Sequence, residues 1–291
     1  MVVIKFIRFV IILIISTAVA PNFAAAADVT ACIESAQNIL DNPNGIKLSL
    51  DSQFLYVADT DNDRIAVLNS LTLKFSREFG KHELDGVRDI DIDPQGKLYA
   101  ADTHNNRVAI YDVRHGLPHL VGELKGGLSH PVSVLAHPNG DIYVSGTWSR
   151  NVVAFRNGKV VAEANRLASP AALEASRDGR IWVSDTSEHQ LLVMNPGLRI
   201  EKFHNGALLG FRGPQDFELI DDDSVIIAEK FSHRIKLVSL SDGSARVIDI
   251  GQPGKSSASI RWPSGVEYRD DILYIADSGN NRVLRCRISF K

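Results

Sequence analysis

The chain has 291 residues, a formal net charge of −3 and two cysteines, and 44% of its residues are hydrophobic. This composition is that of a globular protein large enough to bury its own core. The slightly acidic charge disfavours nucleic acid as a partner, because polyanions are bound by clustered Lys and Arg.

The N-terminal segment, residues 1–27, is predicted to be a signal peptide. Lys5 and Arg8 precede an apolar run, and small residues suited to cleavage end at Ala26 or Ala27. The run is shorter than the ~20 residues of a membrane-spanning helix. We therefore expect cleavage, a periplasmic or secreted location, no transmembrane segment in the mature chain, and a mature formal charge of −5.

The mature chain, residues 28–291, is predicted to form one all-β domain of six repeats. The clearest copy is Tyr274-Ile-Ala-Asp-Ser-Gly-Asn-Asn-Arg-Val283, whose fourth position recurs at intervals of 43, 44, 39, 44 and 48 residues. Its occupants are Asp59, Asp102, Gly146, Asp185, Glu229 and Asp277. Strand-like segments that repeat every ~40–50 residues are typical of propeller blades. The sequence therefore predicts a six-bladed β-propeller of four-stranded antiparallel blades.

Each repeat is expected to begin with an inner strand, continue through a tight turn into the motif, and end in an outer strand. The predicted inner strands cover residues 45–50, 89–92, 132–135, 170–174, 215–219 and 265–268. The predicted outermost strands cover residues 73–79, 119–124, 159–163, 199–203 and 245–250. The sixth repeat has no outermost strand of its own. We expect the N-terminal segment 30–36 to supply it and so to close the ring.

Cys32 and Cys286 are expected to form a disulfide at this closure. Residues 30–36 contain Cys32, and the neighbouring strand of the sixth repeat contains Cys286. An export signal would bring both into a compartment where disulfides form. The alternative is that residues 29–32 form a lipoprotein cleavage box, although residues 21–28 separate it from the apolar run.

The Pro-x-Gly start followed by Tyr-Val-Ala-Asp-x-x-Asn-x-Arg-Val resembles the NHL repeat, and residues 263–283 match it almost throughout. The resemblance covers about residues 42–288. It is weaker in the third repeat, where Gly146 and Asn151 replace Asp and Arg, and in the fourth, where Gln190 replaces Arg. Six NHL repeats imply a six-bladed propeller.

Pairs such as Asp102 with Arg107 have the charges of catalytic pairs. They recur in several repeats, however, so we interpret them as scaffold. A carboxylate at the end of a strand can accept hydrogen bonds from the next turn, and an Arg can pair with it. Function is therefore sought where the repeats differ from one another.

One variable position lies two residues after the repeated Asp, at the expected tip of a loop. Its occupants are Asp61, His104, Trp148, Ser187, Phe231 and Gly279. Exposed aromatic side chains mark binding surfaces, and the connections between blades open on the same face. We therefore predict a ligand-binding patch of His104, Trp148, Arg150, Phe231, His233, Arg261 and Trp262. The alternative is that Trp148 covers a blade edge and Trp262 packs on the last inner strand.

A second variable position lies on the inner strands, and four of its six residues are acidic. It comprises Lys47, Asp91, Leu135, Glu174, Glu218 and Glu267. If these side chains face the central channel, Asp91, Glu174, Glu218 and Glu267 offer oxygen ligands for calcium. Water and ion pairs, including pairs with Lys47, are the alternative occupants. Calcium is the one cofactor that this column suggests.

The predicted function is an exported, monomeric binding module for a protein, peptide or glycan. The alternative is a metal-dependent lyase or lactonase, using calcium or zinc at the central channel. Peptide-amidating lyases resemble this fold but need three inner-strand histidines, which the predicted strands lack. Gluconolactonase-like enzymes also use a channel Asn, which is not evident here. Some NHL propellers bind RNA through a basic face, which the export signal and acidic charge disfavour.

Overall fold

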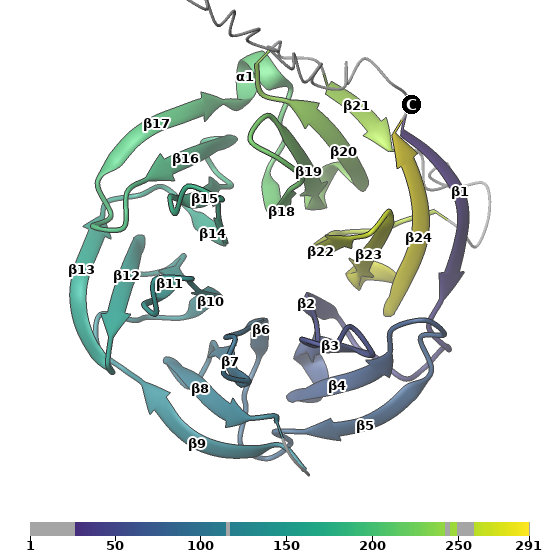
Figure 1. The fold of residues 1–291 in the computed structure, drawn as a ribbon, viewed down its shortest axis with the longest axis horizontal. Coiled ribbons are helices and arrows are strands. Elements are labelled where there is room, and N and C mark those ends of the chain that lie inside the picture. The colour runs from purple at the N-terminus through teal and green to yellow at the C-terminus, as the bar shows by residue number, and fades with distance from the viewer. Residues whose placement is uncertain (1–26, 115–116, 242–244, 249–258, 291) are drawn as a thin grey trace, which may run out of the picture.

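The structure is a computed structural model that describes residues 27–114, 117–241, 245–248 and 259–290. Six four-stranded antiparallel sheets are arranged as blades around a central axis (Figure 1). The predicted fold class is confirmed. The predicted signal peptide lies outside the described residues, except for Ala27.

In every blade the strands run from the axis outward. Blade 1 contains β2 (Pro43–Leu48), β3 (Phe54–Asp59), β4 (Arg64–Asn69) and β5 (Phe75–Phe79). Blade 2 contains β6 (Val87–Ile92), β7 (Lys97–Asp102), β8 (Arg107–Asp112) and β9 (His119–Leu124). Blade 3 contains β10 (Pro131–Ala136), β11 (Ile142–Gly146), β12 (Asn151–Arg156) and β13 (Lys159–Asn165).

The second half of the ring follows the same plan. Blade 4 contains β14 (Pro170–Ala175), β15 (Ile181–Asp185), β16 (Gln190–Met194) and β17 (Ile200–Asn205). Blade 5 contains β18 (Pro214–Leu219), β19 (Ser224–Glu229), β20 (Arg234–Ser239) and β21 (Ala245–Ile248). Blade 6 contains β22 (Pro263–Arg269), β23 (Ile272–Asp277), β24 (Arg282–Phe290) and β1 (Ala27–Glu34).

Helices are short in the described part of the chain, and none is long and apolar enough to cross a membrane. Three single-turn 3-10 helices follow second strands: η1 (Thr60–Asn62), η2 (Lys230–Ser232) and η3 (Ser278–Asn280). The sequence does not predict the four-residue helix α1 (Gly206–Leu209), because one turn is too short to show helical periodicity. The Asn205 side chain caps it by accepting a hydrogen bond from the Ala207 N–H.

The apolar side chains of the strands are buried between adjacent blades. In β3, Leu55 and Val57 belong to a cluster shared with blade 6, whereas Tyr56 and Ala58 belong to a cluster shared with blade 2. This division follows from the alternation of side chains along a strand. Each blade therefore needs both neighbours to bury its two faces, which makes closure of the ring a condition of stability.

Strand β1 closes the ring by pairing antiparallel with β24, and the two strands lie side by side at the edge of blade 6 (Figure 1). Cys32 lies opposite Cys286, and the two form a disulfide with a Cα–Cα distance of 4.1 Å. Glu34 also pairs with Arg282. The predicted closure and disulfide are confirmed.

The disulfide links residues 254 apart in sequence, so it removes much of the conformational freedom of the unfolded chain. We expect the double variant Cys32→Ala/Cys286→Ala to lose about 2–5 kcal/mol of unfolding free energy, measured by urea denaturation. Wild-type protein treated with a reductant is the control and should match the variant. Equal midpoints for the oxidised wild type and the variant would contradict a stapling role.

Candidate functional site

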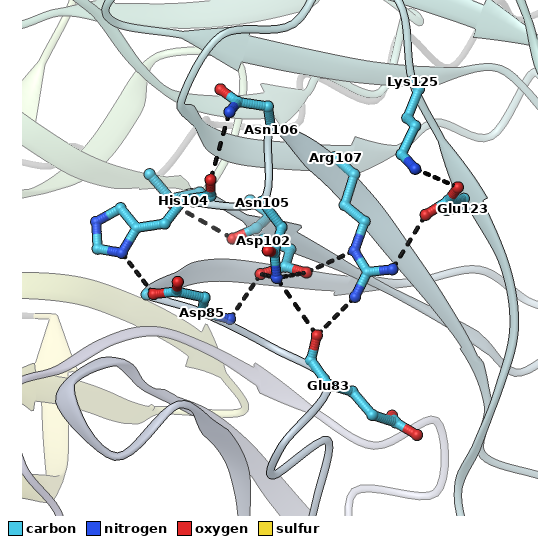
Figure 2. Close-up of polar contacts among 12 residues, drawn as sticks. Glu83, Asp85, Asp102, His104, Asn105, Asn106, Arg107, Glu123 and Lys125 are labelled. Carbon is cyan, nitrogen blue, oxygen red and sulfur yellow. Dashed lines mark hydrogen bonds and ion pairs between the residues drawn. The ribbon is translucent and has the colours of Figure 1, made fainter.

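The repeated polar residues hold the backbone together, as blade 2 illustrates (Figure 2). Asp102 accepts hydrogen bonds from the Asp85 N–H at 2.8 Å and from Arg107 Nε at 2.7 Å. Arg107 also donates to the Glu83 carbonyl at 2.6 Å and to the Glu123 carboxylate at 3.0 Å. Asp102 is fully buried. These contacts support the scaffold interpretation of the motif.

Blade 3 keeps this arrangement although it has neither the Asp nor the Arg. Asn151 Nδ2 donates to the Gly127 carbonyl at 2.8 Å and to the Glu163 carboxylate at 2.6 Å. These acceptors correspond to the backbone and carboxylate acceptors of Arg107 in blade 2. The departure from the repeated motif at Asn151 therefore preserves the connection and is no sign of a catalytic site.

A further set of hydrogen bonds ties the second-to-third-strand loop of five blades to the segment that enters the next blade. The residue that ends each second-to-third-strand loop accepts from a backbone N–H just before an inner strand. The pairs are Asp63 with Gly86, Asn106 with His130, His189 with Gly213, His233 with Trp262, and Asn281 with Asn42. Predicted ligand-binding residue His233 therefore uses Nδ1 for the scaffold.

Trp262 has an unusual backbone conformation for its size. Its φ is +50°, and the residues at the equivalent positions of other blades include Gly86 and Gly213, with φ of +62° and +65°. A bulky residue in the left-handed region is uncommon and costs on the order of 1 kcal/mol or more. The equivalent residues of two other blades, Asn42 and His130, also have positive φ, at +50° and +52°, so Trp262 differs from them in the size of its side chain.

The predicted ligand-binding residues fall into two clusters on the loop face. The first, on blades 2 and 3, contains the predicted residues His104 and Trp148 together with His130, which was not predicted. The Trp148 ring stacks on His130 at 4.2 Å between centroids, and His130 lies 6.3 Å from His104. Trp148 is 73% exposed, so it does not cover a blade edge. Nearby, Arg150 donates from Nε to the Leu167 carbonyl.

The second cluster, on blades 5 and 6, contains Phe231, Trp262, Arg261 and His233. Arg261 lies over the Trp262 ring, with Cζ 4.5 Å from the ring centroid, and His233 lies 6.1 Å from the same ring. Phe231 is 69% exposed and Trp262 is 43% exposed. The Phe231 ring lies over Gly213, where an added Cβ would be 3.0 Å from Cδ2. The first cluster therefore lies on blades 2 and 3, and the second lies on blades 5 and 6.

Phe231 and Trp262 both line an open pocket of about 500 Å³, which we call the blade-6 pocket. Its lining residues are Asp41, Asn42, Asp61, Lys230, Phe231, Trp262, Ser278, Gly279 and Asn281. Gly279 occupies the loop-tip position that carries a side chain in every other blade. The floor of the pocket therefore lies where blade 6 has no tip side chain.

Sequence comparison of the repeats did not single out Lys230, although the signal was present. The equivalent residue in the other five blades is Thr60, Thr103, Thr147, Thr186 or Ser278. Each of these hydroxyls donates to the carbonyl of the first residue of the next blade's inner strand. Lys230 replaces this recurring hydrogen bond with a cation. The absence of a hydroxyl at this one of six equivalent positions is the sequence signal for Lys230.

The acidic column of the inner strands does face the central channel. Lys47 Nζ lies 3.4 Å from Asp91 Oδ1 and 3.4 Å from Glu267 Oε2, so it joins strands of three blades. Burial lowers the pKa of Lys47, but the surrounding carboxylates, including Glu174 and Glu218, outweigh it and raise that pKa well above its ordinary value. Lys47 is therefore charged and already supplies a cation to the column.

Burial also shifts the carboxyl groups. It raises the pKa of Glu174 to about 7, although Lys47 opposes the shift, and it raises the pKa of Glu218 well above the ordinary value. Nearer the loop face, burial raises the pKa of Asp89 to about 6, and burial together with repulsion from Asp89 raises that of Asp216 well above its usual range. The channel is thus lined by carboxyl groups that hold protons at mildly acidic pH.

The oxygen-rich column suits calcium chemically, but Lys47 already lies among the carboxylates. Within the described ranges, no three or more His, Cys, Asp or Glu side chains are grouped so as to hold a metal ion. The throat of the channel, lined by Asp89, Ser133 and Asp216 among others, has a volume of about 20 Å³. This is room for about one water molecule, so an organic ligand would have to bind outside the throat.

Comparison with known proteins supports the fold. No protein-family model and no curated protein matches the sequence. Virginiamycin B lyase from Staphylococcus aureus is similar in structure, with a TM-score of 0.65 and 15% identity over 88% of this chain and 99% of that chain. An auxiliary nutrient binding protein from Bacteroides thetaiotaomicron has a TM-score of 0.69 and 14% identity, over 86% and 69% of the two chains. At such identities the likeness shows the six-bladed propeller.

The raised carboxyl pKa values predict how stability changes with pH. The folded protein holds these protons to higher pH than the unfolded chain, so their contribution is full below about pH 4 and is lost as pH rises through about 6 to 7. We expect Glu174→Gln to reduce the fall in unfolding free energy between pH 5 and pH 8 by about 1–2 kcal/mol, measured by urea denaturation.

The matched control is Glu188→Gln, which removes an exposed carboxylate on a loop of the same blade. This variant should keep the wild-type dependence on pH. An unchanged pH dependence in Glu174→Gln would show that Glu174 titrates normally in the folded protein.

Proposed function

We propose that the protein is an exported NHL-type propeller that binds a protein, peptide or glycan ligand through its loop face. The observation that carries this proposal is the blade-6 pocket, in which Phe231 and Trp262 expose aromatic surface beside a polar floor. Aromatic side chains supply large contact areas at binding sites. Exposing them to water without a ligand is unfavourable.

Two further observations support a binding role at this pocket. Trp262 keeps a left-handed backbone conformation that the smaller residues glycine, asparagine and histidine adopt at the equivalent positions of other blades. Arg261 lies over the Trp262 ring, which fixes the orientation of the indole. A ring that is held in place before a ligand arrives loses less conformational entropy on binding.

Export is supported by the disulfide between Cys32 and Cys286, because such bonds persist in oxidising compartments such as the periplasm or the extracellular space. The NHL-type character is supported by the repeated motif, in which Asp102, Arg107 and their equivalents bind each other and stabilise the blades. Binding then depends on the residues that differ between repeats.

A metal-dependent lyase or lactonase is the alternative proposal, and virginiamycin B lyase is among the similar structures. Its site would be the carboxylates Asp91, Glu174, Glu218 and Glu267. The ammonium of Lys47 between two of them and the water-sized throat favour binding at the mouth over catalysis in the channel. Stoichiometric calcium in the purified protein, lost in Glu218→Gln, would instead favour the enzyme.

The double variant Phe231→Ser/Trp262→Ser tests the proposed surface. A panel of peptides and oligosaccharides is screened by thermal shift, and each binder is measured by calorimetry. We expect the variant to weaken binding at least tenfold, because the loss of two aromatic contacts costs about 2 kcal/mol or more. Its own unfolding midpoint should stay close to that of the wild type, since both side chains are exposed.

The control is Leu71→Ser, which removes a 66% exposed apolar side chain from a turn at the opposite end of the strands. It should bind as the wild type does. If a ligand binds equally to the wild type and the double variant, the loop face around Phe231 and Trp262 is not the binding surface.

A further inference from the structure

Two cations lie at the mouth of the channel beside the blade-6 pocket, and their arrangement defines the ligand more closely. Lys230 lines that pocket, and Arg88 lines the throat. The charges of Arg88 and Asp61 both act on Lys230, so the three side chains share one region of the loop face. Lys230 belongs to blade 5 and Arg88 to blade 2, so they approach the mouth from opposite sides of the ring.

Neither cation has a side-chain hydrogen bond or an ion pair with another residue of the described ranges, although 17 ion pairs are present there. This distinguishes them from Arg64, Arg107, Arg234 and Arg282, which all pair with carboxylates. Burial lowers the pKa of Lys230, Arg88 lowers it further, and Asp61 opposes the shift. A partly buried ammonium beside a second cation is an unfavourable arrangement that an anion would relieve.

The replacement at Lys230 also has a structural cost. In the other blades a Thr or Ser hydroxyl at this position donates to a backbone carbonyl, as Thr186 does to the Pro214 carbonyl at 2.9 Å. Lys230 cannot reproduce that short contact. When one blade of a repeat protein has an unpaired cation in place of a recurring hydrogen bond, the replacement indicates a local function at that blade.

The channel acids do not account for these cations. The largest influences on Asp89 and Asp216 are burial, hydrogen bonds to Ser133 and to backbone N–H groups, and other carboxylates. The cation among the deeper acids is Lys47. Lys230 and Arg88 are therefore available to a ligand.

The neutral polar groups of the pocket are already engaged with one another. Asn42 Nδ2 donates to Asp61 at 3.1 Å, and its N–H donates to Asn281 Oδ1 at 2.9 Å. Asn281 Nδ2 donates to Asp41 at 3.0 Å. A glycan needs free donors and acceptors for its hydroxyls, whereas this pocket offers aromatic surface, the unpaired Lys230, and the carboxylates of Asp41 and Asp61, which already accept hydrogen bonds.

We propose that the blade-6 pocket and the adjoining mouth of the channel bind a carboxylate joined to an apolar body, with the carboxylate at the mouth between Lys230 and Arg88 and the apolar body in the pocket against Phe231 and Trp262. A peptide C-terminus with an apolar last residue and a small aromatic acid both have this chemistry. The inference rests on the proposed function, because it uses the same pocket. It adds Lys230 and Arg88 as the residues that select for charge.

The key variant is Lys230→Thr, which restores the residue type of the other blades. Because the hydroxyl can donate to the backbone as in those blades, the variant should fold with an unfolding midpoint equal to or above that of the wild type. This separates loss of binding from loss of structure. Lys97→Thr, which removes an exposed lysine at the start of β7, is the matched control for net charge.

The probes are 3-phenylpropionate with its neutral amide, and an acetylated tripeptide ending in Phe as free acid and as amide. Calorimetry at low salt should show at least tenfold tighter binding of one acid than of its amide, and added salt should weaken it. Lys230→Thr and Arg88→Gln should each reduce this preference at least fivefold, while Lys97→Thr leaves it unchanged. The acid that shows the effect identifies the source, a small molecule or a peptide end.

Three outcomes would overturn the inference. These are equal binding of acid and amide, an undiminished preference for the acid in Lys230→Thr, or no binding of either acid at millimolar concentration. If acid and amide bind equally but both are weakened in Phe231→Ser/Trp262→Ser, the proposed binding surface stands and the selection for charge fails. If a probe binds equally to the wild type, to Phe231→Ser/Trp262→Ser, and to Lys230→Thr and Arg88→Gln, both proposals fail.

Discussion

The ring depends on the carboxylate that ends the second strand in five of the six blades and accepts hydrogen bonds from the loop that enters the blade. Asp102 binds the Asp85 N–H, Asp59 binds the Asp41 N–H, and Asp277 binds the Arg261 N–H. A buried carboxylate is costly unless it is paired and hydrogen-bonded. These three residues meet both conditions, and in doing so each fixes the inner strand of its blade relative to the second strand beside it.

This rule explains why most polar residues of the loop face are unavailable for function, and why the exceptions are informative. The Asp, Asn and Arg side chains of the motif are engaged in hydrogen bonds that hold the loops, and His233 also accepts one of these bonds through Nδ1. Among the described residues, the exposed aromatic side chains Phe231 and Trp262 and the cations Lys230 and Arg88 lie outside this hydrogen-bond network. The proposed site thus consists of side chains that have no role in holding the blades together.

The fold was predictable because its signals are periodic. The spacing of the repeated Asp gave the number of blades, and the missing last strand together with Cys32 and Cys286 gave the closure. The site was harder to predict, since its members come from different repeats. No spacing along the chain shows that Lys230 and Arg88 meet at one mouth, or that Lys47 reaches Asp91 and Glu267 across three blades. Those contacts depend on the curvature of the closed ring. Trp148 and Phe231 were identified correctly as exposed residues, but not their separation into two clusters.

The way in which β1 completes blade 6 also has a consequence for how the chain must assemble. The first strand of the described domain is synthesised before every other strand, yet its partner β24 is the last. Until β24 is synthesised, the hydrogen-bonding edge of β1 has no partner strand. Contacts between such distant segments form slowly, because the loop that they close is long. The N-terminal strand therefore acts as the latch of the domain: the blades between can pair locally as they appear, and the finished ring exists only once its two ends have met.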